Sequence, residues 1–358
     1  MSNLPKTMKA VVAYAPGDYR LEEIPVPVPK EGEMLIKIEA CGICAGDVKA
    51  MHGAPRFWGG EDFPPYIIAP FTPGHEFVGH VAAMGANVRG DFKVGDRVVS
   101  EQIVPCMECK FCKTGRYWMC QPHDVYGFKD RVNGGMAEYM ILPKNSINFK
   151  VNESIPVEKA VLIEPYSCSM HCVDRAQVGN QDVVVLAGVG TLGLGMVGAI
   201  RQRNPKKFVV IDYNDKRLAL ALKFGADIAL NPSKDDVMKT VLDLTDGYGC
   251  DIYIEASGHP LAVKQGLDML RKLGRFVEFS VFGSPAVIDW SVISDSKELD
   301  VLGVHLSPWC YEPVIEWIGN GTLPTDGVVT HSFSLDKWDE GFKMAENGQE
   351  ALKVILKP

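Results

Sequence analysis

Residues 183–212 read VVVLAGVGTLGLGMVGAIRQRNPKKFVVID. The stretch opens with a short apolar run rich in β-branched residues, which predicts a strand buried on both faces. A glycine-rich turn follows, then residues compatible with a helix, and then a second apolar run that ends in an acid. This order of strand, turn, helix, strand and acid predicts a dinucleotide-binding unit.

The glycines and the acid each meet a physical requirement of a bound dinucleotide. Gly188, Gly190 and Gly193 have G-x-G-x-x-G spacing, which permits the tight turn, leaves room for the pyrophosphate and lets the helix pack on the strand. Asp212 lies where a carboxylate accepts hydrogen bonds from the adenosine ribose hydroxyls and would repel a 2′-phosphate. We therefore expect NAD rather than NADP, with Arg217 near the adenine. A turn without a ligand is the alternative, but the strand and helix context favours the cofactor.

The composition of the chain excludes several classes of protein. With 358 residues and a formal net charge of −8, the chain is long enough for two domains, and nucleic acid or an anionic membrane is an unsuitable partner. No apolar segment approaches the length of a membrane span, and the first residues lack the architecture of a signal peptide. We therefore expect a cytoplasmic protein whose ten cysteines are free thiols or metal ligands.

Two hydrophobic patterns divide the chain. Residues 9–40 alternate in strand fashion and begin an all-β unit, whereas strands alternate with helices from Asp182 to about residue 300. The second pattern predicts an α/β fold with a doubly wound parallel sheet. The expected domains are 1–166 with 304–358, and 167–303.

The expected parallel sheet also places loops near the cofactor. Ligands bind outside the carboxyl ends of the strands in such folds, so residues 256–258 and 280–283 should lie close to it. One of the expected crossover helices runs through residues 261–274.

Four cysteines form the strongest local motif. Cys106, Cys109, Cys112 and Cys120 have the spacing C-x2-C-x2-C-x7-C, in a lobe at about residues 101–122. Four thiolates this close can surround one zinc ion, and a site filled by protein ligands leaves no position for substrate, so we predict a structural zinc. Four unligated thiols are the alternative, but exposed free thiols are prone to oxidation.

Three residues near the N-terminal end suit a second zinc ion. Cys44, His75 and Glu76 offer a thiolate, an imidazole and a carboxylate, and three protein ligands leave one position for water or substrate, as in catalytic sites. Glu164 is a further candidate, either as a fourth ligand or as an acceptor for zinc-bound water. We expect Cys41 to be a packed core residue.

Two other stretches leave alternatives open. Cys168, His171 and Cys172 could suggest a metal site, but ordinary helix packing is the favoured interpretation. Residues 51–71 predict a long loop whose aromatic residues either line a pocket or pack against the loop itself. These aromatic residues are Phe57, Trp58, Phe63 and Tyr66.

The whole pattern resembles the zinc-dependent medium-chain alcohol and polyol dehydrogenases, over essentially all of the chain. The resemblance is carried by CGIC with Asp47, PGHE ending at Glu76, VGDRV at 94–98, the four-cysteine lobe, EP at 164–165 and the glycine fingerprint. The acid followed by proline is similar to the sorbitol and other polyol dehydrogenases. The stretches VVSEQIVPC, MCQPHDVYGFK, ASGHPLAVKQGL and KELDVLGVHLSPW look more like the bacterial erythritol and L-threitol dehydrogenases.

The resemblance implies a GroES-like catalytic domain joined to a Rossmann cofactor domain, with two zinc ions per subunit and NAD. In this family the residues matching Cys44, His75 and Glu76 bind the catalytic zinc, with Glu164 nearby. Zinc acts as a Lewis acid on a secondary hydroxyl of a small polyol, hydride passes to the nicotinamide and a ketose forms. The NAD contacts implied besides the glycines are Leu192, Asp212, Arg217, Val281, Phe282, Val304 and His305.

One position departs from the family pattern. Gly46 stands where the family usually has Ser or Thr, whose hydroxyl takes the proton from the substrate, and Lys49 stands where a relay His is often found. We therefore expect a water chain in the space left by Gly46, with Lys49, Glu164 or His52 beyond it.

Two alternative functions fit the same residues. One is action on sorbitol, xylitol or a simple secondary alcohol or diol, and the other is nucleotide binding on the same fold without catalysis. We also expect a homo-oligomer, either a dimer or a tetramer, because the last sheet strand, within residues 300–305, can pair across a twofold axis.

Overall fold

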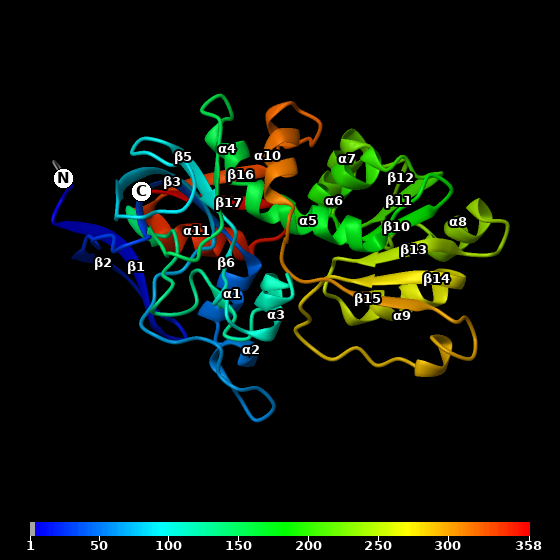
Figure 1. Cartoon of the computed structure of the whole chain (residues 1–358). Helices are drawn as coiled ribbons and strands as arrows, with labels where there is room; N and C mark the ends of the chain where they lie inside the picture. The colour runs from blue at the N-terminus through cyan, green and yellow to red at the C-terminus, as the bar shows by residue number, and fades with distance from the viewer. Residues whose placement is uncertain (1–3) are drawn as a thin grey trace. The chain divides into compact units, whose positions relative to one another are not determined.

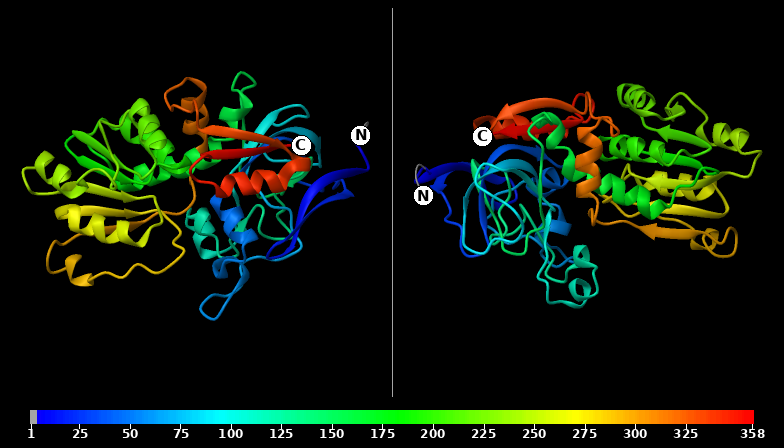
Figure 2. Two further views of the ribbon diagram at one scale, coloured as in Figure 1. Left: turned by 180° about the vertical axis from the view of Figure 1, so that it is seen from behind. Right: turned by 45° about the horizontal axis from the view of Figure 1, so that its top comes forward.

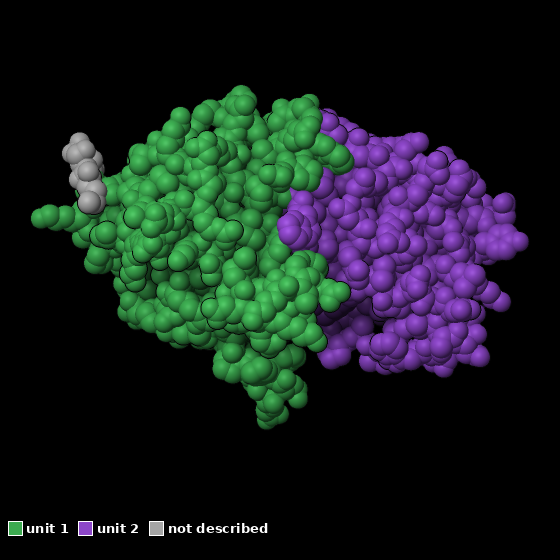
Figure 3. All heavy atoms as spheres, viewed as in Figure 1, with its two compact units in different colours: residues 1–164, 311–320, 325–358 green, residues 165–310, 321–324 purple. Residues whose placement is uncertain are grey.

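The computed structural model describes residues 4–358, which form two compact units (Figure 3). The first unit takes residues up to Glu164 together with 311–320 and 325–358, and the second takes 165–310 and 321–324. Residues 304–310, which the sequence analysis assigns to the first domain, lie in the second unit.

The first unit is built on a seven-stranded sheet (Figure 1). Its strand order is β16-β17-β3-β4-β5-β9, and β8 also pairs with β3. These strands are β3 (Met34–Ile43), β4 (Glu76–Met84), β5 (Arg97–Ser100), β8 (Tyr139–Leu142), β9 (Asn148–Lys150), β16 (Val329–Ser334) and β17 (Lys353–Lys357). Two-stranded ribbons add β1 (Thr7–Ala15) with β2 (Asp18–Pro25) and β6 (Ile103–Val104) with β7 (Asp124–Val125).

Short helices complete this unit, and α11 lies along β16 and β17 (Figure 2). The helices are α1 (Ala45–Met51), α2 (Pro55–Trp58), α3 (Lys110–Lys113), α4 (Val157–Ala160), α10 (Tyr311–Gly319) and α11 (Trp338–Glu346). The long loop expected at residues 51–71 thus contains one helical turn, α2, which starts with proline at a first-turn position where its missing N–H costs nothing.

The second unit contains the predicted parallel sheet. All six strands are parallel, in the order β12-β11-β10-β13-β14-β15, which is the doubly wound order 3-2-1-4-5-6. The strands are β10 (Val183–Ala187), β11 (Lys207–Ile211), β12 (Ile228–Leu230), β13 (Cys250–Glu255), β14 (Leu270–Glu278) and β15 (Asp300–Gly303). The helices are α6 (Thr191–Gln202), α7 (Asp215–Phe224), α8 (Val237–Leu244) and α9 (Pro260–Met269), and α5 (Ile163–Ala176) begins at the boundary of the units.

One expected helix is shorter than its sequence suggests. The helix predicted through residues 261–274 ends at Met269, because Leu270 has an extended backbone and pairs with Cys250 at the start of β14. Sheet pairing here overrides a stretch whose local propensity is helical. The prediction was therefore wrong for residues 270–274.

Burial in the second unit explains the unbroken apolar runs in its sequence. Val185 and Val209 are fully buried at the centre of the sheet, where they pack in one cluster with Tyr253 and Phe276. Within residues 4–358, no helix combines the length and apolar character needed to cross a membrane.

Candidate metal centres and cofactor site

The antiparallel pairing of β3 with β4 brings together the three residues expected to bind catalytic zinc. Gly42 near the end of β3 is opposite Glu76 at the start of β4, so Cys44 just after one strand meets His75 just before the other. The potential ligand atoms of Cys44, His75 and Glu76 all lie within 4.8 Å of one another. The strand register thus brings together residues that lie about 30 positions apart in the sequence. Their thiolate, imidazole and carboxylate groups form a donor set that suits zinc.

Asp47 supports this donor set. Its Oδ2 accepts a hydrogen bond of 2.9 Å from the Cys44 amide, as part of a capping box at the start of α1. Its Oδ1 lies 3.7 Å from Nδ1 of His75, and neither of these two buried atoms has a hydrogen-bond partner within residues 4–358. A carboxylate on the outer nitrogen is the usual way in which a metal-binding histidine is oriented. The motif around Cys44 contains Asp47, but the sequence alone gave this residue no role.

Charge around His75 favours a positive species at this position. Burial lowers the pKa of His75, but Asp47 and Cys44 outweigh that effect and hold the pKa well above its usual value. The same negative charges would stabilise a bound metal cation.

Glu164 lies near this centre without belonging to the tight donor set. It is 7% exposed, and its charge contributes to raising the pKa values of His75 and Lys353. Among residues 4–358, the group with donor atoms within 4.8 Å contains Cys44, His75 and Glu76 and does not include Glu164.

Lys353 is a residue of this centre that the sequence analysis missed. Its Nζ donates to Glu76 Oε1 at 2.7 Å, to Oε2 at 2.5 Å and to the Ile43 carbonyl at 3.1 Å. Both charged side chains are buried, because β17 pairs with β3 and β3 pairs with β4. No local pattern could have revealed this pair, since 277 residues separate its members.

Aromatic residues bound the space beside Gly46. A Cβ atom at Gly46 would lie 3.7 Å from Cys44 Sγ and 3.9 Å from Cζ of both Phe57 and Phe128, which are ordinary van der Waals distances. Phe57 stacks on Phe128 with ring centroids 5.2 Å apart, and Phe128 in turn lies 5.5 Å from the His75 ring. Of the loop aromatics, Phe57 thus borders the donor set, while Trp58 packs on Phe71 and Tyr66 on Phe128.

The structure gives Lys49 and His52 different surroundings. Lys49 is half-buried in the last turn of α1. His52 is exposed, with Nε2 2.6 Å from Oε1 of Glu346.

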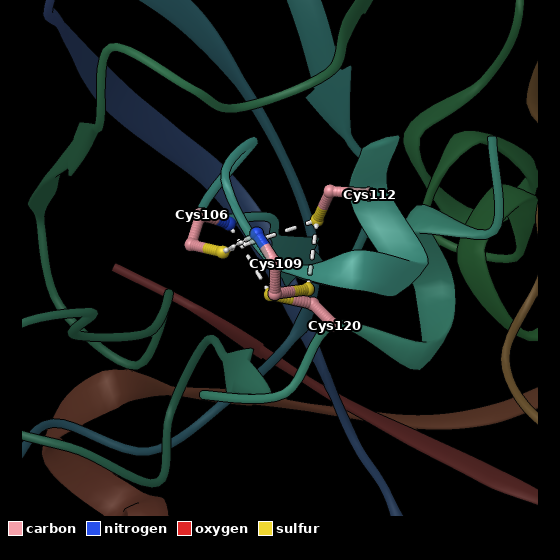
Figure 4. A group of neighbouring side chains, drawn as sticks. All are labelled: Cys106, Cys109, Cys112 and Cys120. Atoms are coloured by element: carbon pink, nitrogen blue, oxygen red, sulfur yellow. Dashed lines mark hydrogen bonds between the residues drawn. The ribbon is translucent and has the colours of Figure 1, made fainter. Parts of the chain in front are cut away.

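The four predicted zinc cysteines converge in one lobe (Figure 4). Sγ of Cys112 lies 3.6 Å from that of Cys109 and 4.0 Å from that of Cys106, and a tetrahedron with Zn–S bonds of about 2.3 Å has edges of about 3.8 Å. Hydrogen bonds from the Cys112 and Gln121 amides lower the pKa of Cys109 to about 6, which favours the thiolate. Burial raises the pKa of Cys112 to about 12 and also raises the pKa of Cys120, so it is the spacing of the four sulfur atoms that fits a closed zinc site.

The other cysteines considered in the sequence are buried. Cys41 is fully buried in β3, and Cys168 and Cys172 are buried on α5 with His171 beside them. None of these residues belongs to either group of potential metal ligands within residues 4–358.

The glycine turn after β10 has the geometry that its spacing predicts. Gly188 has φ of 93°, and a Cβ there would lie 2.7 Å from backbone atoms of Ala256 and Ser257, so only glycine fits. A Cβ at Gly193 would lie 2.1 Å from the Gly188 carbonyl oxygen, which shows how closely helix and turn approach. Gly190, the N-cap of α6, has one atom in reach, an Arg217 guanidinium nitrogen at 3.9 Å, so its outer face is open for a phosphate group.

Asp212 is fixed beside this turn by its own backbone contacts. Oδ2 accepts from the Val189 amide and Oδ1 from the Asn214 amide, both at 2.9 Å. The carboxylate therefore stabilises the glycine turn as well as standing at the end of β11, where a ribose would lie.

The remaining expected cofactor residues lie beyond the carboxyl ends of strands or in the first turn of α6. Leu192 is in that first turn, and its carbonyl accepts a hydrogen bond from Ser169. Val281 is 52% exposed after the end of β14, with Phe282 following it. Val304 and His305 follow β15, and the Val304 amide donates to the Glu278 carbonyl.

Comparison with known proteins places the chain in a family. Residues 30–153 match the family described as alcohol dehydrogenase GroES-like domain, and residues 191–320 match the family described as zinc-binding dehydrogenase. The chain is 51% identical over 361 residues to the erythritol/L-threitol dehydrogenase of Mycolicibacterium smegmatis, with 100% of both proteins covered.

Solved structures give the same result. An alcohol dehydrogenase from Escherichia coli CFT073, complexed with NADH, is similar with a TM-score of 0.87 and 27% identity, covering 99% of this chain and 100% of that one. The 2R,3R-butanediol dehydrogenase of Bacillus subtilis has a TM-score of 0.86 and 27% identity, covering 98% and 99%. The predicted GroES-like and Rossmann folds are confirmed, and the chain belongs to the zinc-binding dehydrogenases with a GroES-like domain, enzymes that use zinc and a nicotinamide cofactor.

Proposed function

We propose that this enzyme oxidises a secondary hydroxyl of a four-carbon polyol, of the erythritol or L-threitol type, to the ketose with NAD as acceptor. The observation that carries the substrate class is 51% identity over the full length to the M. smegmatis enzyme. The donor set of Cys44, His75 and Glu76 supports the reaction type, because it is close-set and backed by a buried carboxylate, as a metal centre requires.

Cys44, His75 and Glu76 would hold the catalytic zinc, with Glu164 as the adjacent carboxylate. A zinc ion bound there supplies Lewis acidity that favours loss of the substrate hydroxyl proton near neutral pH. The protein residues do the positioning: Asp47 faces Nδ1 of His75 at 3.7 Å and acts on the ring through its charge, and Lys353 holds Glu76 by both carboxylate oxygens. Phe57 and Phe128 border one side of the donor set, next to the space left by Gly46.

The proton leaves by a route without a side-chain hydroxyl at position 46. Gly46 leaves space beside the Cys44 thiolate, and we propose that water in this space passes the proton toward Lys49 or Glu164. His52 is the weakest of the three expected acceptors, because it is exposed and already paired with Glu346.

The cofactor preference rests on Asp212. Its carboxylate is held at the end of β11 by the Val189 and Asn214 amides, so it cannot easily swing away from a ribose 2′-phosphate. We therefore propose NAD over NADP, with the glycine turn and the residues after β14 and β15 as the binding surface.

We also propose a structural zinc at Cys106, Cys109, Cys112 and Cys120, which gives two zinc ions per subunit. A homo-oligomer, dimer or tetramer, would form through the edge strand β15, whose residues are largely exposed in the isolated chain. A cytoplasmic location remains a prediction of the sequence.

The test is the initial rate of NAD reduction by the zinc-replete protein with erythritol, L-threitol, D-threitol, xylitol, sorbitol and butane-2,3-diol, each repeated with NADP. We expect the highest kcat/KM with a tetritol and NAD. Activity confined to longer polyols or simple diols would replace the substrate class and keep the reaction. No turnover of any alcohol by a protein with bound zinc would contradict the proposal and favour nucleotide binding without catalysis.

A further inference from the structure

Lys129 is a buried cation in the first unit whose ammonium hydrogens all have acceptors. The residue is 5% exposed, and Nζ donates to the Pro122 carbonyl at 2.7 Å, the His123 carbonyl at 3.2 Å and Asp124 Oδ1 at 3.0 Å. The ammonium also lies 4.6 Å from the centroid of the Tyr66 ring. Burying a lysine is costly unless its donors are satisfied, so this arrangement firmly connects the chain just after Cys120 to the aromatic loop.

The same connection is reinforced by Tyr66. Its hydroxyl donates to the His123 carbonyl at 2.9 Å, so phenol and ammonium share one acceptor. Residues 122–124 are thereby bound by both Tyr66 and Lys129.

Phe128, the neighbour of Lys129, reaches the donor set. The backbone on either side of Lys129 is tied to the aromatic loop, because the Ile68 amide donates to the Phe128 carbonyl and the Asp130 amide donates to the Ile68 carbonyl. Lys129 and Phe128 are adjacent in the chain and both contact the ring of Tyr66, Lys129 through its ammonium at 4.6 Å and Phe128 through its ring at 5.8 Å, so fixing Lys129 and Tyr66 also fixes Phe128. The Phe128 ring packs on His75, Phe57 and Tyr66, with centroid distances of 5.5, 5.2 and 5.8 Å.

Phe57 and Phe128 together form what we call the aromatic wall. Both rings reach within 3.9 Å of the Cβ position of Gly46, beside the Cys44 thiol. A substrate with a hydroxyl at Cys44 and His75 would therefore lie beside these two rings.

We infer that Lys129 is a positioning residue for substrate: by joining residues 122–124 to Tyr66 it fixes the aromatic wall and so determines which polyol chain length fits. The inference rests on the proposed function, in that the polyol binds at Cys44 and His75. It adds that the four-cysteine lobe, whose last cysteine is Cys120, is connected through residues 122–124 to the aromatic side chains beside Cys44.

The test compares Lys129→Met with a control, Lys150→Met. Lys150, in β9, also combines an ion pair, 3.0 Å to Asp96, with an aromatic contact, 5.8 Å to the Phe92 ring, but its side chain is 46% exposed, so it controls for the loss of a Lys–Asp pair and not for burial. For each protein we would measure kcat and KM with the best tetritol and with sorbitol, together with zinc content and NADH affinity. We expect Lys129→Met to lower the tetritol-to-sorbitol ratio of kcat/KM at least about 10-fold, mainly through KM, with zinc and NADH binding unchanged.

Tyr66→Phe is measured in parallel and should lower the tetritol-to-sorbitol ratio of kcat/KM by a smaller factor. Lys129→Arg, which keeps the positive charge, should retain most of the wild-type ratio. An unchanged ratio in Lys129→Met, or an equal change in Lys150→Met, would overturn the inference. If Lys129→Met does not fold, an unchanged ratio in Tyr66→Phe has the same consequence.

A second readout separates this inference from the proposed function. Alkylation of Cys44 by iodoacetamide, followed by peptide mass mapping, reports access past the aromatic wall without any need for turnover. We expect it to be at least about 3-fold faster in Lys129→Met than in wild type. A wild-type protein that oxidises no polyol contradicts the proposed function, while an unchanged alkylation rate contradicts the role of Lys129.

Discussion

Lys353 holds both carboxylate oxygens of Glu76 in a buried ion pair, at 2.7 and 2.5 Å. The two side chains are 5% and 3% exposed, and they meet because β3 lies between β17 and β4 in the sheet. The last strand of the chain therefore completes a centre whose other members lie in its first quarter.

Lys353→Met should destabilise the protein by about 3–5 kcal/mol, because it leaves the buried Glu76 carboxylate without its partner. Urea unfolding of the zinc-free protein measures this loss, because a bound zinc ion would give Glu76 a second partner. The control is Lys357→Met on the same strand, whose pair with Glu158 is exposed and should be worth about 1 kcal/mol or less. Equal losses in the two variants would show that the buried pair has no special role.

Cys112→Ser should reduce the zinc content from about two ions to about one ion per chain, since a three-thiolate site binds zinc less tightly. Metal analysis after gel filtration measures the ratio. Cys172→Ala removes a buried thiol outside both groups and should leave the zinc content unchanged. Retention of full zinc content by Cys112→Ser would contradict the structural zinc site.

Asp212→Ser should reduce the preference for NAD over NADP, in kcat/KM, by at least roughly 10-fold, because repulsion of the 2′-phosphate is removed. Asp212→Asn separates charge from shape, since its amide oxygen can still accept one of the two bonds from the Val189 and Asn214 amides. Asp215→Ser, at an exposed acid nearby, serves as the control. An unchanged preference for NAD over NADP in both Asp212 variants would mean that other residues recognise the adenosine ribose.

Gly46→Ser should fold, because its Cβ would meet atoms at 3.7 Å or more, and should raise kcat at least about 3-fold by supplying a hydroxyl for proton transfer. Gly46→Ala is the matched control for volume and should leave kcat within about 2-fold. Steady-state kinetics with the best polyol separates the two effects. A rise in KM in both variants, without a rise in kcat, would instead show that Gly46 provides room for substrate.

Glu101 should make stability depend on pH. Burial raises its pKa from 4.5 to about 7, although the bond from the Tyr117 hydroxyl acts in the opposite direction. The folded protein therefore binds more protons than the unfolded chain between these values, so the free energy of unfolding falls as pH rises through this window, by up to about 3 kcal/mol.

Glu101→Gln tests this effect because it keeps an acceptor for Tyr117 and removes the ionisation. Relative to wild type, the variant should gain stability between pH 5 and pH 8 in urea unfolding. A constant difference across this range would contradict the assignment to Glu101.

The sequence alone determined the features that local patterns encode. The glycine spacing at 188–193, the acid at 212 and the four-cysteine motif depend on residues close in the chain, and periodicity predicted the parallel sheet. Such features can be predicted without the tertiary structure, because the turn, the strand and the zinc lobe are each formed by a short segment. The failure at residues 270–274 shows the limit, since pairing with Cys250 overrode helical propensity there.

The tertiary structure alone decided the partners of the catalytic donor set. Lys353 reaches Glu76 and Phe128 reaches His75 only through strand register and loop packing. Their separations in sequence are large, and no periodicity links residues across such distances. The sequence thus determined which residues have the chemistry to bind zinc and cofactor, whereas the fold decided which other residues hold them in place, because a one-residue change in strand register would redirect each side chain to the opposite face.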